Sequence, residues 1–278
     1  MTIADAALPR TRIEPSGTWA IDVRELWAYR ELLGFLIWRD VKVRYKQTAL
    51  GIAWAVLQPL VPMVLFTVIF GRVAKLPSDG VPYPLFTLAG LLPWQLFASA
   101  LGGASGSVVG SSGLITKVYF PRLITPLAAV CAALVDFVVS LILLILLMTW
   151  YGWTPDARVA LVPVFVLWAM LAAFGVALWT SSLNVRYRDV QYLMPFVTQV
   201  WLLASPVAYS LTLVSSSPWR VVYALNPMVG VVQGFRWALL GSAAPGEAMW
   251  PGIIVTLLIT AGGLVYFRRT EDSFADLI

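Results

Sequence analysis

Residues 123–150 read LITPLAAVCAALVDFVVSLILLILLMTW, an apolar run in which Asp136 is the single charged residue. A helix of this length can cross the roughly 30 Å hydrocarbon core of a bilayer. The run ends at the aromatic residues Trp150, Tyr151 and Trp153, a composition typical of a membrane–water interface. This stretch therefore predicts a transmembrane helix and sets the fold class of the chain.

The rest of the chain has the same character. Of its 278 residues, 60% are hydrophobic and only 12% are charged, whereas soluble domains average about 25% charged residues. This excess of apolar surface requires lipid, which excludes a soluble enzyme. Further apolar runs cover Leu50–Phe70, Leu85–Ser105, Val159–Ser182, Tyr192–Tyr209 and Trp250–Phe267. We therefore predict an all-α integral membrane protein with six transmembrane helices.

The 19 Lys and Arg residues predict the orientation of the chain. The loops of one side hold only Arg72, Lys75, Arg158, Arg220 and Arg236, so that side is predicted to be outer and both termini cytoplasmic. The first 20 residues are polar and lack the apolar core of a signal peptide. Because the basic residues are dispersed beside the membrane, the net charge of +5 is a topology signal and predicts no nucleic acid partner.

Two segments depart from simple membrane crossing. Residues 24–46, between a tail at 1–23 and the transmembrane domain at 47–278, alternate charged and apolar residues at helical spacing, which predicts an amphipathic interface helix. Its apolar side would carry Leu26, Leu33, Leu36 and Ile37. A soluble helix packed on the rest of the protein is the alternative. The domain is predicted to end in a short cytoplasmic C-terminal tail.

The second segment is Ser217–Leu240, which predicts two short helices that enter the outer leaflet and return. Asn226 and Pro227 are suited to begin a helix and Gly241 to end it. The apolar part of that helix holds Arg236 and is too short to cross the membrane.

The sequence contains few residues that could serve as catalytic groups or metal ligands. The chain has no histidine, and its one cysteine, Cys131, can form neither an intrachain disulfide nor a thiolate metal cluster, so we predict no metal site. The segment GGASGSVVGSSG at 102–113 lacks the lysine and the preceding strand of a phosphate loop. Asp136 predicts either a functional intramembrane acid or an acid hydrogen-bonded within the helix bundle. The acids that could form a cluster at the membrane interface are expected to be solvated: Asp40, Asp189, Glu271, Asp272 and Asp276.

Four segments together resemble one protein family. They are RYKQTALGIAWAVLQPL at 44–60, KVYFPRLITPLA at 117–128, NVRYRDV at 184–190 and NPMVGVVQGFRWALLG at 226–241. The resemblance is to the membrane subunits of type-2 ABC exporters, which move lipid-linked O-antigen, teichoic acid, galactan or capsular polysaccharide across the bacterial cytoplasmic (inner) membrane. It implies a homodimer with two copies of a separate ATPase subunit, which would bind ATP and Mg in place of this chain. It also implies a coupling helix after the second crossing and two outer gate helices.

The resemblance assigns roles to two groups of charged and aromatic residues. The coupling helix would lie around Leu114–Phe120, where Lys117, Tyr119, Phe120 and Arg122 offer the aromatic and charged anchors of an ATPase interface. An ordinary cytoplasmic loop is the alternative. The basic cluster Arg39, Lys42, Arg44 and Lys46 would receive the diphosphate of the lipid-linked substrate. Topology anchoring alone is the alternative for that cluster.

Aromatic residues and the outer helices complete the predicted sites. Sugar rings stack on aromatic faces, so aromatic side chains within the spans could line a polymer pathway, although most are expected to face lipid or pack between helices. The candidates are Trp54, Phe66, Phe70, Phe196 and Trp201, and Trp94 and Phe97 also lie within spans. The gate helices would be represented by Asn226, Pro227, Arg236 and Trp237.

These observations predict a permease subunit that exports a lipid-linked polysaccharide at the expense of ATP hydrolysed by its partner. An ABC exporter of a drug or a small lipid shares the same helical plan and is the alternative. A membrane-embedded glycosyltransferase or lipid phosphatase is a third possibility, but it would require an acid cluster or a metal motif at the interface.

Overall fold

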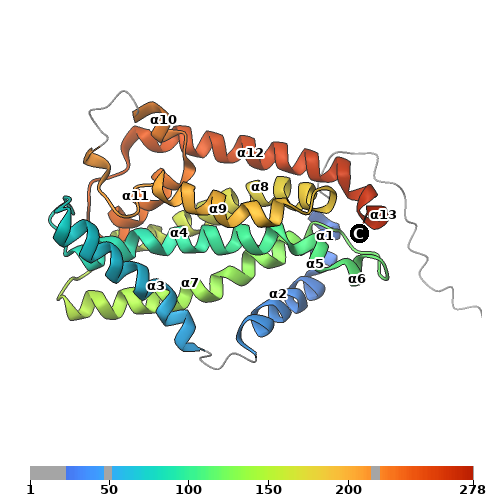
Figure 1. The fold of residues 1–278 in the computed structure, drawn as a ribbon, viewed down its shortest axis with the longest axis horizontal. Helices are drawn as coiled ribbons and strands as arrows, with labels where there is room; N and C mark the ends of the chain where they lie inside the picture. Colours follow the sequence, from blue (N-terminus) through green and yellow to red (C-terminus); the bar gives the residue numbers. More distant parts are fainter. Residues whose placement is uncertain (1–22, 47–51, 214–219, 278) are drawn as a thin grey trace, which may run out of the picture.

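The computed structural model describes residues 23–46, 52–213 and 220–277, and the regular elements within these ranges are helical. Long helices run lengthwise through the bundle (Figure 1). They are α3 (Ile52–Phe66), which continues as the π-helical η1 (Thr67–Val73), α4 (Tyr83–Ser105), α7 (Ile124–Trp150), α8 (Val162–Arg186) and α12 (Met249–Thr270). In the described part of the chain, five helical segments are long and apolar enough to cross a membrane. The protein is therefore a multi-pass helical membrane protein.

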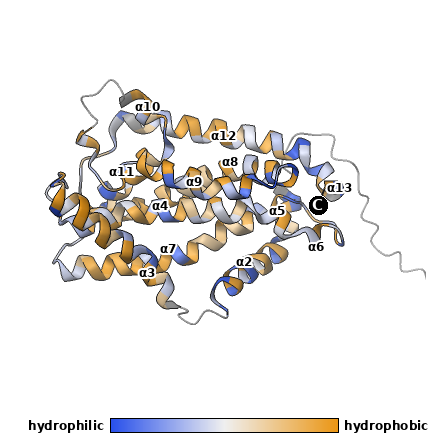
Figure 2. Cartoon of the chain, in the orientation of Figure 1, coloured by the Kyte–Doolittle hydropathy of each residue, from blue (hydrophilic) through white to orange (hydrophobic). Residues whose placement is uncertain are grey.

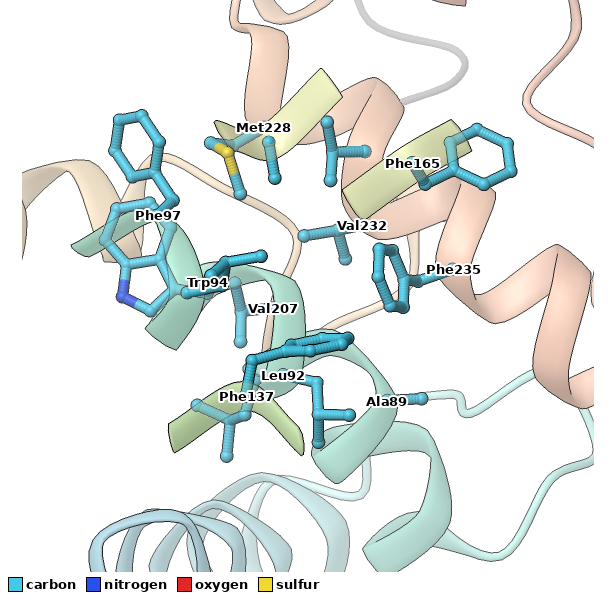
Figure 3. Packing of buried hydrophobic residues seen from close by; sticks show 14 of the residues in the cluster. Ala89, Leu92, Trp94, Phe97, Phe137, Phe165, Val207, Met228, Val232 and Phe235 are labelled. Atoms are coloured by element: carbon cyan, nitrogen blue, oxygen red, sulfur yellow. The ribbon is translucent and has the colours of Figure 1, made fainter. Parts of the chain in front are cut away.

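Helix α4 forms the centre of the bundle. Its apolar residues are buried all round, as expected for a helix surrounded by other helices. Figure 3 shows Leu92 and Phe97 of α4 in one cluster with Phe137 of α7, Phe165 of α8 and Val232 of α11 (Pro227–Leu240). Phe137 of α7 and Phe235 of α11 pack edge to face there, with ring centroids 6.0 Å apart. The short helix α11 is thus part of the core of the molecule.

Polarity follows the long axis of the bundle. Figure 2 shows hydrophobic residues along the lengths of α3, α7 and α12, and hydrophilic residues on α2 (Arg30–Tyr45) and where α12 meets α13 (Phe274–Leu277).

The shorter elements are α5 (Ser107–Gly110), α6 (Ser112–Ile115), η2 (Ala157–Leu161), η3 (Leu211–Leu213), η4 (Gly246–Ala248) and η5 (Glu271–Ser273).

The predicted fifth crossing, Tyr192–Tyr209, is wrong in its bounds. Helix α9 covers Val190–Leu203 and has 14 residues, a rise of about 21 Å against a hydrocarbon core of roughly 30 Å. Turns follow at 204–209. Pro206 explains this ending, because proline donates no backbone hydrogen bond and disfavours helical geometry at the preceding residue.

The interface segment forms two helices, α1 (Val23–Ala28) and α2, with a break at Tyr29. Leu36 is fully buried and Leu26, Leu33 and Ile37 pack around the same cluster, so the predicted apolar side is confirmed. The other side exposes Trp27, Phe35 and Trp38. The segment therefore packs on the bundle and also presents aromatic side chains suited to a membrane interface.

Helices α10 (Arg220–Ala224) and α11 lie where two short helices were predicted. The Oδ1 atom of Asn226 accepts a hydrogen bond from the Met228 amide at 3.0 Å, Pro227 is the first helical residue, and Gly241 adopts φ 70°. The predicted helix start and end are confirmed. Residues 217–219 of the predicted segment lie outside the described residues.

The prediction of a coupling helix around Leu114–Phe120 is wrong in its bounds. Helix α6 ends at Ile115, a turn and a bend follow at 116–118, and residues 119–120 belong to no regular element. Pro121 explains the loss of helix, because a proline pushes the residue before it, Phe120, away from the helical region.

Candidate functional site

The end of the bundle that carries α1, α2 and α13 contains the residues predicted to dock the ATPase. Lys117 and Tyr119 are exposed, and 58% of the surface of Tyr119 is accessible. Phe120 is only 3% exposed and packs in the cluster that contains Leu36. The predicted interface role of Phe120 is therefore corrected, because its ring is buried within this cluster and Tyr119 is the exposed aromatic side chain of the loop.

Arg122 faces the C-terminal end of the chain. Its guanidinium donates a hydrogen bond to the backbone carbonyl of Glu271. The Glu271 carboxylate forms an ion pair with Arg268 at 2.8 Å, and its side chain is only 12% exposed. The prediction that Glu271 is solvated is wrong, because the fold brings α12 and η5 against the loop at 116–122. Asp40 was also expected to be solvated, but it is paired with Arg39 at 2.9 Å.

Helix α1 adds residues that the sequence did not reveal. The Tyr119 hydroxyl donates to a Glu25 carboxylate oxygen at 3.5 Å, and the Tyr29 hydroxyl donates to the Tyr119 carbonyl, also at 3.5 Å. Partial burial and the nearby Glu25 carboxylate raise the pKa of Tyr119. These pairs are separated by 94 and 90 residues, so no local pattern could have linked them.

The side chains of the basic cluster predicted to receive the diphosphate point in two directions, some toward the bundle and some away from it. The Arg39 guanidinium lies between Asp40 and the Ser111 hydroxyl, to which it donates at 3.5 Å. Lys42 and Lys46 are exposed on the outside of α2. Their spacing of four residues places them on one side of the helix. Lys42 and Lys46 are thus the members of the cluster that present their side chains outward.

Arg44 points toward the bundle, where it meets Asp136. Its guanidinium forms an ion pair with Asp136, and the Tyr45 hydroxyl donates to the same carboxylate. Asp136 lies twelve residues beyond the start of α7, a rise of about 18 Å. The prediction of a hydrogen-bonded acid within the bundle is confirmed. Its partners come from the end of α2.

Asp136 lines a small crevice of about 10 Å³ between α3, α4 and α7. Its other polar lining residues are Gln58, Gln95, Ser99 and Ser140, and the rest of its lining is apolar: Ala55, Pro59, Leu96, Ala133 and Phe137. The Arg44 guanidinium donates to the Ser99 hydroxyl at 3.4 Å, and the Gln95 amide donates to the Gln58 carbonyl at 3.2 Å. The crevice therefore offers hydrogen-bonding groups within a membrane-embedded bundle, where such groups are costly and commonly functional.

The aromatic residues predicted to line a pathway do not form one row. Trp54 on α3 and Phe196 on α9 are exposed by 60% and 66%. Phe66 and Phe70 pack edge to face, with centroids 5.5 Å apart. Trp201 packs on Phe97 at 4.9 Å. Trp94 and Phe97 are buried in the core, so they connect helices and do not face an open path.

The opposite end of the bundle is held together by Arg236 of α11. Its side chain is fully buried and donates to the carbonyls of Pro206 at 2.6 Å, Tyr209 at 3.2 Å and Phe86 at 3.2 Å. It also donates to Val207 at 2.5 Å. Three of these four carbonyls belong to residues 206–209, in the turn after α9, where the backbone makes no helical hydrogen bonds. Arg236 therefore provides hydrogen-bond donors for the backbone of this turn.

Asn226 fastens the same turn from the start of α11. Its amide donates to the Ala204 carbonyl at 3.1 Å and to the Ser205 hydroxyl at 3.0 Å, while its oxygen accepts from the Trp201 indole at 2.9 Å. The loop before α4 adds Asp79, which accepts from the Ser210 hydroxyl at 2.8 Å. We call residues 204–210 and their partners Arg236, Asn226 and Asp79 the latch.

Comparison with known sequences gives the family. The profile of the ABC-2 type transporter family matches residues 31–240. The chain belongs to this family. An O-antigen export system permease protein, RfbA of Myxococcus xanthus, is 34% identical over 92% of this chain and 98% of its own length. An RfbA of Klebsiella pneumoniae is 26% identical over 89% and 95%, and the polysialic acid transport protein KpsM of Escherichia coli is 24% identical over 86% and 93%.

The region matched by the ABC-2 type transporter family runs from the start of α2 to the end of α11. It thus includes the exposed lysines of α2, the crevice at Asp136, the exposed Tyr119 and the latch. Helix α12 follows the matched region and returns the chain to the end that carries α2, where Phe267 and Phe274 pack in one cluster with Leu36.

Proposed function

We propose that this chain is the permease subunit of an ATP-driven exporter that moves a lipid-linked polysaccharide, such as O-antigen, across the bacterial cytoplasmic membrane. The observation that carries the proposal is the 34% identity to an O-antigen export permease over 92% of the chain. The multi-pass helical bundle supports it, because a substrate-translocating subunit requires such a fold. ATP and Mg would be bound by a separate ATPase subunit.

The proposed topology has six crossings and two cytoplasmic termini. Leu36 of α2 and Phe274 of α13 pack in one cluster, so the chain enters and leaves the bundle at the same end. This requires an even number of crossings, and the described residues contain five long apolar segments and the shorter α9. Helix α9 is therefore proposed to cross as well, as the fifth of six crossings in chain order. The basic residues of α2 and of the end of α12 favour a cytoplasmic position for that end.

In this topology, α10 and α11 lie at the outer end and act as the gate helices. The latch supports this assignment, because it connects them to the end of α9 through polar contacts that can exchange for others. Arg236 and Asn226 would hold the closed state, with Pro227 fixing the start of α11 and Trp237 lying near its end.

The subunit is proposed to act as a homodimer with two ATPase subunits. Exposed apolar faces on α3 and α9 support a self-association surface; they carry Trp54, Val61, Phe196 and Val200. The ATPase would dock at the opposite end on Lys117 and Tyr119, with Glu25 beside them. Exposed aromatic and charged residues of this kind dominate protein interfaces. Arg122 and Phe120 would support the docking loop from within.

The diphosphate of the substrate is proposed to arrive at Lys42 and Lys46, which present exposed cations beside the membrane. From there the sugars would pass Asp136, where the crevice of about 10 Å³ would have to widen before sugar hydroxyl groups exchange hydrogen bonds with Gln58, Gln95 and Ser99. Arg39 and Arg44 would lie near this entrance without binding the diphosphate, because they pair with Asp40 and Asp136.

Substrate-stimulated ATP hydrolysis tests the proposal. The complex with its ATPase is purified and reconstituted, and hydrolysis is measured with lipid-linked polysaccharide, with the lipid carrier alone, and with drug-like or small lipid compounds. We expect stimulation by the polysaccharide on its carrier. Equal or greater stimulation by a drug or small lipid would instead favour the alternative exporter class.

A further inference from the structure

A cavity of about 580 Å³ lies between α8, α11 and α12, and it shares no lining residue with the crevice at Asp136 or with the latch. Its walls include Val164 and Leu171 of α8, Ile253 and Leu257 of α12, and Trp237 of α11. Leu257 is 54% exposed and Val164 is 57% exposed, so the cavity opens sideways between the two long helices. In a membrane-spanning protein this opening faces lipid.

The interior of the cavity offers almost no hydrogen-bonding group to a ligand. Among the described residues that line it, Thr256 carries the one side-chain hydroxyl. This hydroxyl donates to the Gly252 carbonyl at 2.8 Å and accepts from the Trp168 indole at 2.9 Å. Because these polar atoms are paired within the protein, the cavity suits a hydrocarbon chain.

The depth of the cavity matches one leaflet. Its lining extends from Leu161, at the end of η2, to Leu171 of α8, a distance of about 15 Å along the helix axis, or half of the roughly 30 Å hydrocarbon core.

The mouth of the cavity carries a positive charge. The Arg158 guanidinium lies over the Trp237 ring, 5.7 Å from its centroid, and Trp237 lines the cavity. The Arg158 side chain is 45% exposed, and its contact with the largely exposed Asp156 is long, at 3.8 Å. An exposed ion pair of this length contributes little, so the guanidinium can turn to a stronger anion such as a phosphate.

We propose that this cavity binds an anionic phospholipid of the bilayer, with an acyl chain between α8 and α12 and the phosphate at Arg158. The cavity opens to lipid and its lining suits an apolar chain. The Arg158 guanidinium lies at the end of the cavity where a lipid headgroup would be. Trp237 would separate the two parts of the lipid, with its ring against the chain and under the cation.

Photocrosslinking in vesicles tests the proposal. The complex is reconstituted in phosphatidylcholine with a trace of phosphatidylglycerol or phosphatidylcholine that carries a photoreactive acyl chain, and labelled peptides are mapped by mass spectrometry. We expect residues 161–171 and 249–257 to be labelled about fivefold more by the anionic lipid, the effect of one cation near the headgroups. Equal labelling by the two lipids would overturn the assignment of an anionic headgroup.

Two variants locate the parts of the site. Arg158→Gln should abolish the preference for the anionic lipid, whereas Arg72→Gln, at another exposed arginine, should leave it unchanged. Ile253→Trp should fill the cavity and lower labelling by both lipids, whereas Leu258→Trp, on the exposed side of α12, should not. Val164→Trp fills the opposite wall and replaces Ile253→Trp if that variant inserts poorly.

Two results would contradict the site itself. Labelling that persists in both cavity-filling variants would show that the chain lies elsewhere. Displacement of phosphatidylglycerol by a much lower concentration of a polyprenyl diphosphate would assign the cavity to the carrier lipid instead of the bilayer. The experiment measures no export or ATP hydrolysis, so its outcome is independent of the proposed function.

Discussion

The side chains of the basic cluster, Arg39, Lys42, Arg44 and Lys46, are close together in the sequence but have different surroundings in the structure. Lys42 and Lys46 point outward, so Lys42→Gln with Lys46→Gln should weaken stimulation of ATP hydrolysis by the lipid-linked substrate without lowering thermal stability. The loss should resemble that caused by added salt, because both reduce attraction for the diphosphate. Stimulation equal to wild type at every salt concentration, on matched amounts of inserted complex, would exclude these lysines from the entrance.

Arg44 should behave differently because it neutralises Asp136. Arg44→Gln is expected to lower the free energy of unfolding by about 1–2 kcal/mol, less than the 3–5 kcal/mol of a fully buried pair because both side chains are partly exposed. Asp136→Asn in the same chain should restore most of the stability, since it removes the unpaired charge. Thermal unfolding of the purified protein measures this, and two additive losses would contradict the pairing.

Gly90 is required by the close approach of Arg236 to α4. A Cβ atom at Gly90 would lie 2.7 Å from a guanidinium nitrogen of Arg236 and 2.9 Å from the Val207 carbonyl oxygen. Gly90→Ala should therefore destabilise the protein by about 1–3 kcal/mol. Gly102→Ala is the matched control in the same helix, with open space at its Cβ, and should be neutral or stabilising by up to about 1 kcal/mol. Equal thermal stabilities of the two variants would refute the steric argument.

At the scale of elements, the loop at 116–122 has an exposed part and a buried part. Tyr119→Ala should reduce the amount of ATPase that co-purifies with the subunit while leaving its thermal stability unchanged. Phe120→Ala should instead destabilise the protein by about 3 kcal/mol, the usual cost of removing a buried phenylalanine. If the subunit with Tyr119→Ala retains its ATPase and exports normally, the docking surface lies elsewhere.

At the scale of the whole molecule, the number of crossings determines on which side of the membrane each loop and terminus lies. In a Cys131→Ser background, Glu247→Cys should react with an impermeant thiol reagent in intact cells, whereas Ser273→Cys should react only after the membrane is opened. Both residues are exposed in the structure, so access to the reagent depends on the side of the membrane. Reaction of both cysteines in intact cells would place both ends of α12 outside and would contradict a crossing by that helix.

The sequence by itself determined the class of fold and the main helices. Long apolar runs such as Ile124–Trp150 have few alternatives, because backbone groups in lipid must pair within a helix. Local chemistry also determined the start and end of α11, since Asn226, Pro227 and Gly241 act on their immediate neighbours. The apolar side of α2 followed from helical periodicity for the same reason.

Only the tertiary structure decided which polar residues meet. Arg44 and Asp136 are far apart in the sequence, as are Arg122 and Glu271, and each pair forms because packed helices bring distant positions together. The burial of Phe120, the division of the basic cluster and the carbonyls bound by Arg236 depend on the same packing. Periodicity places a residue on one side of its own helix, but the neighbours on that side are set by the arrangement of the whole bundle.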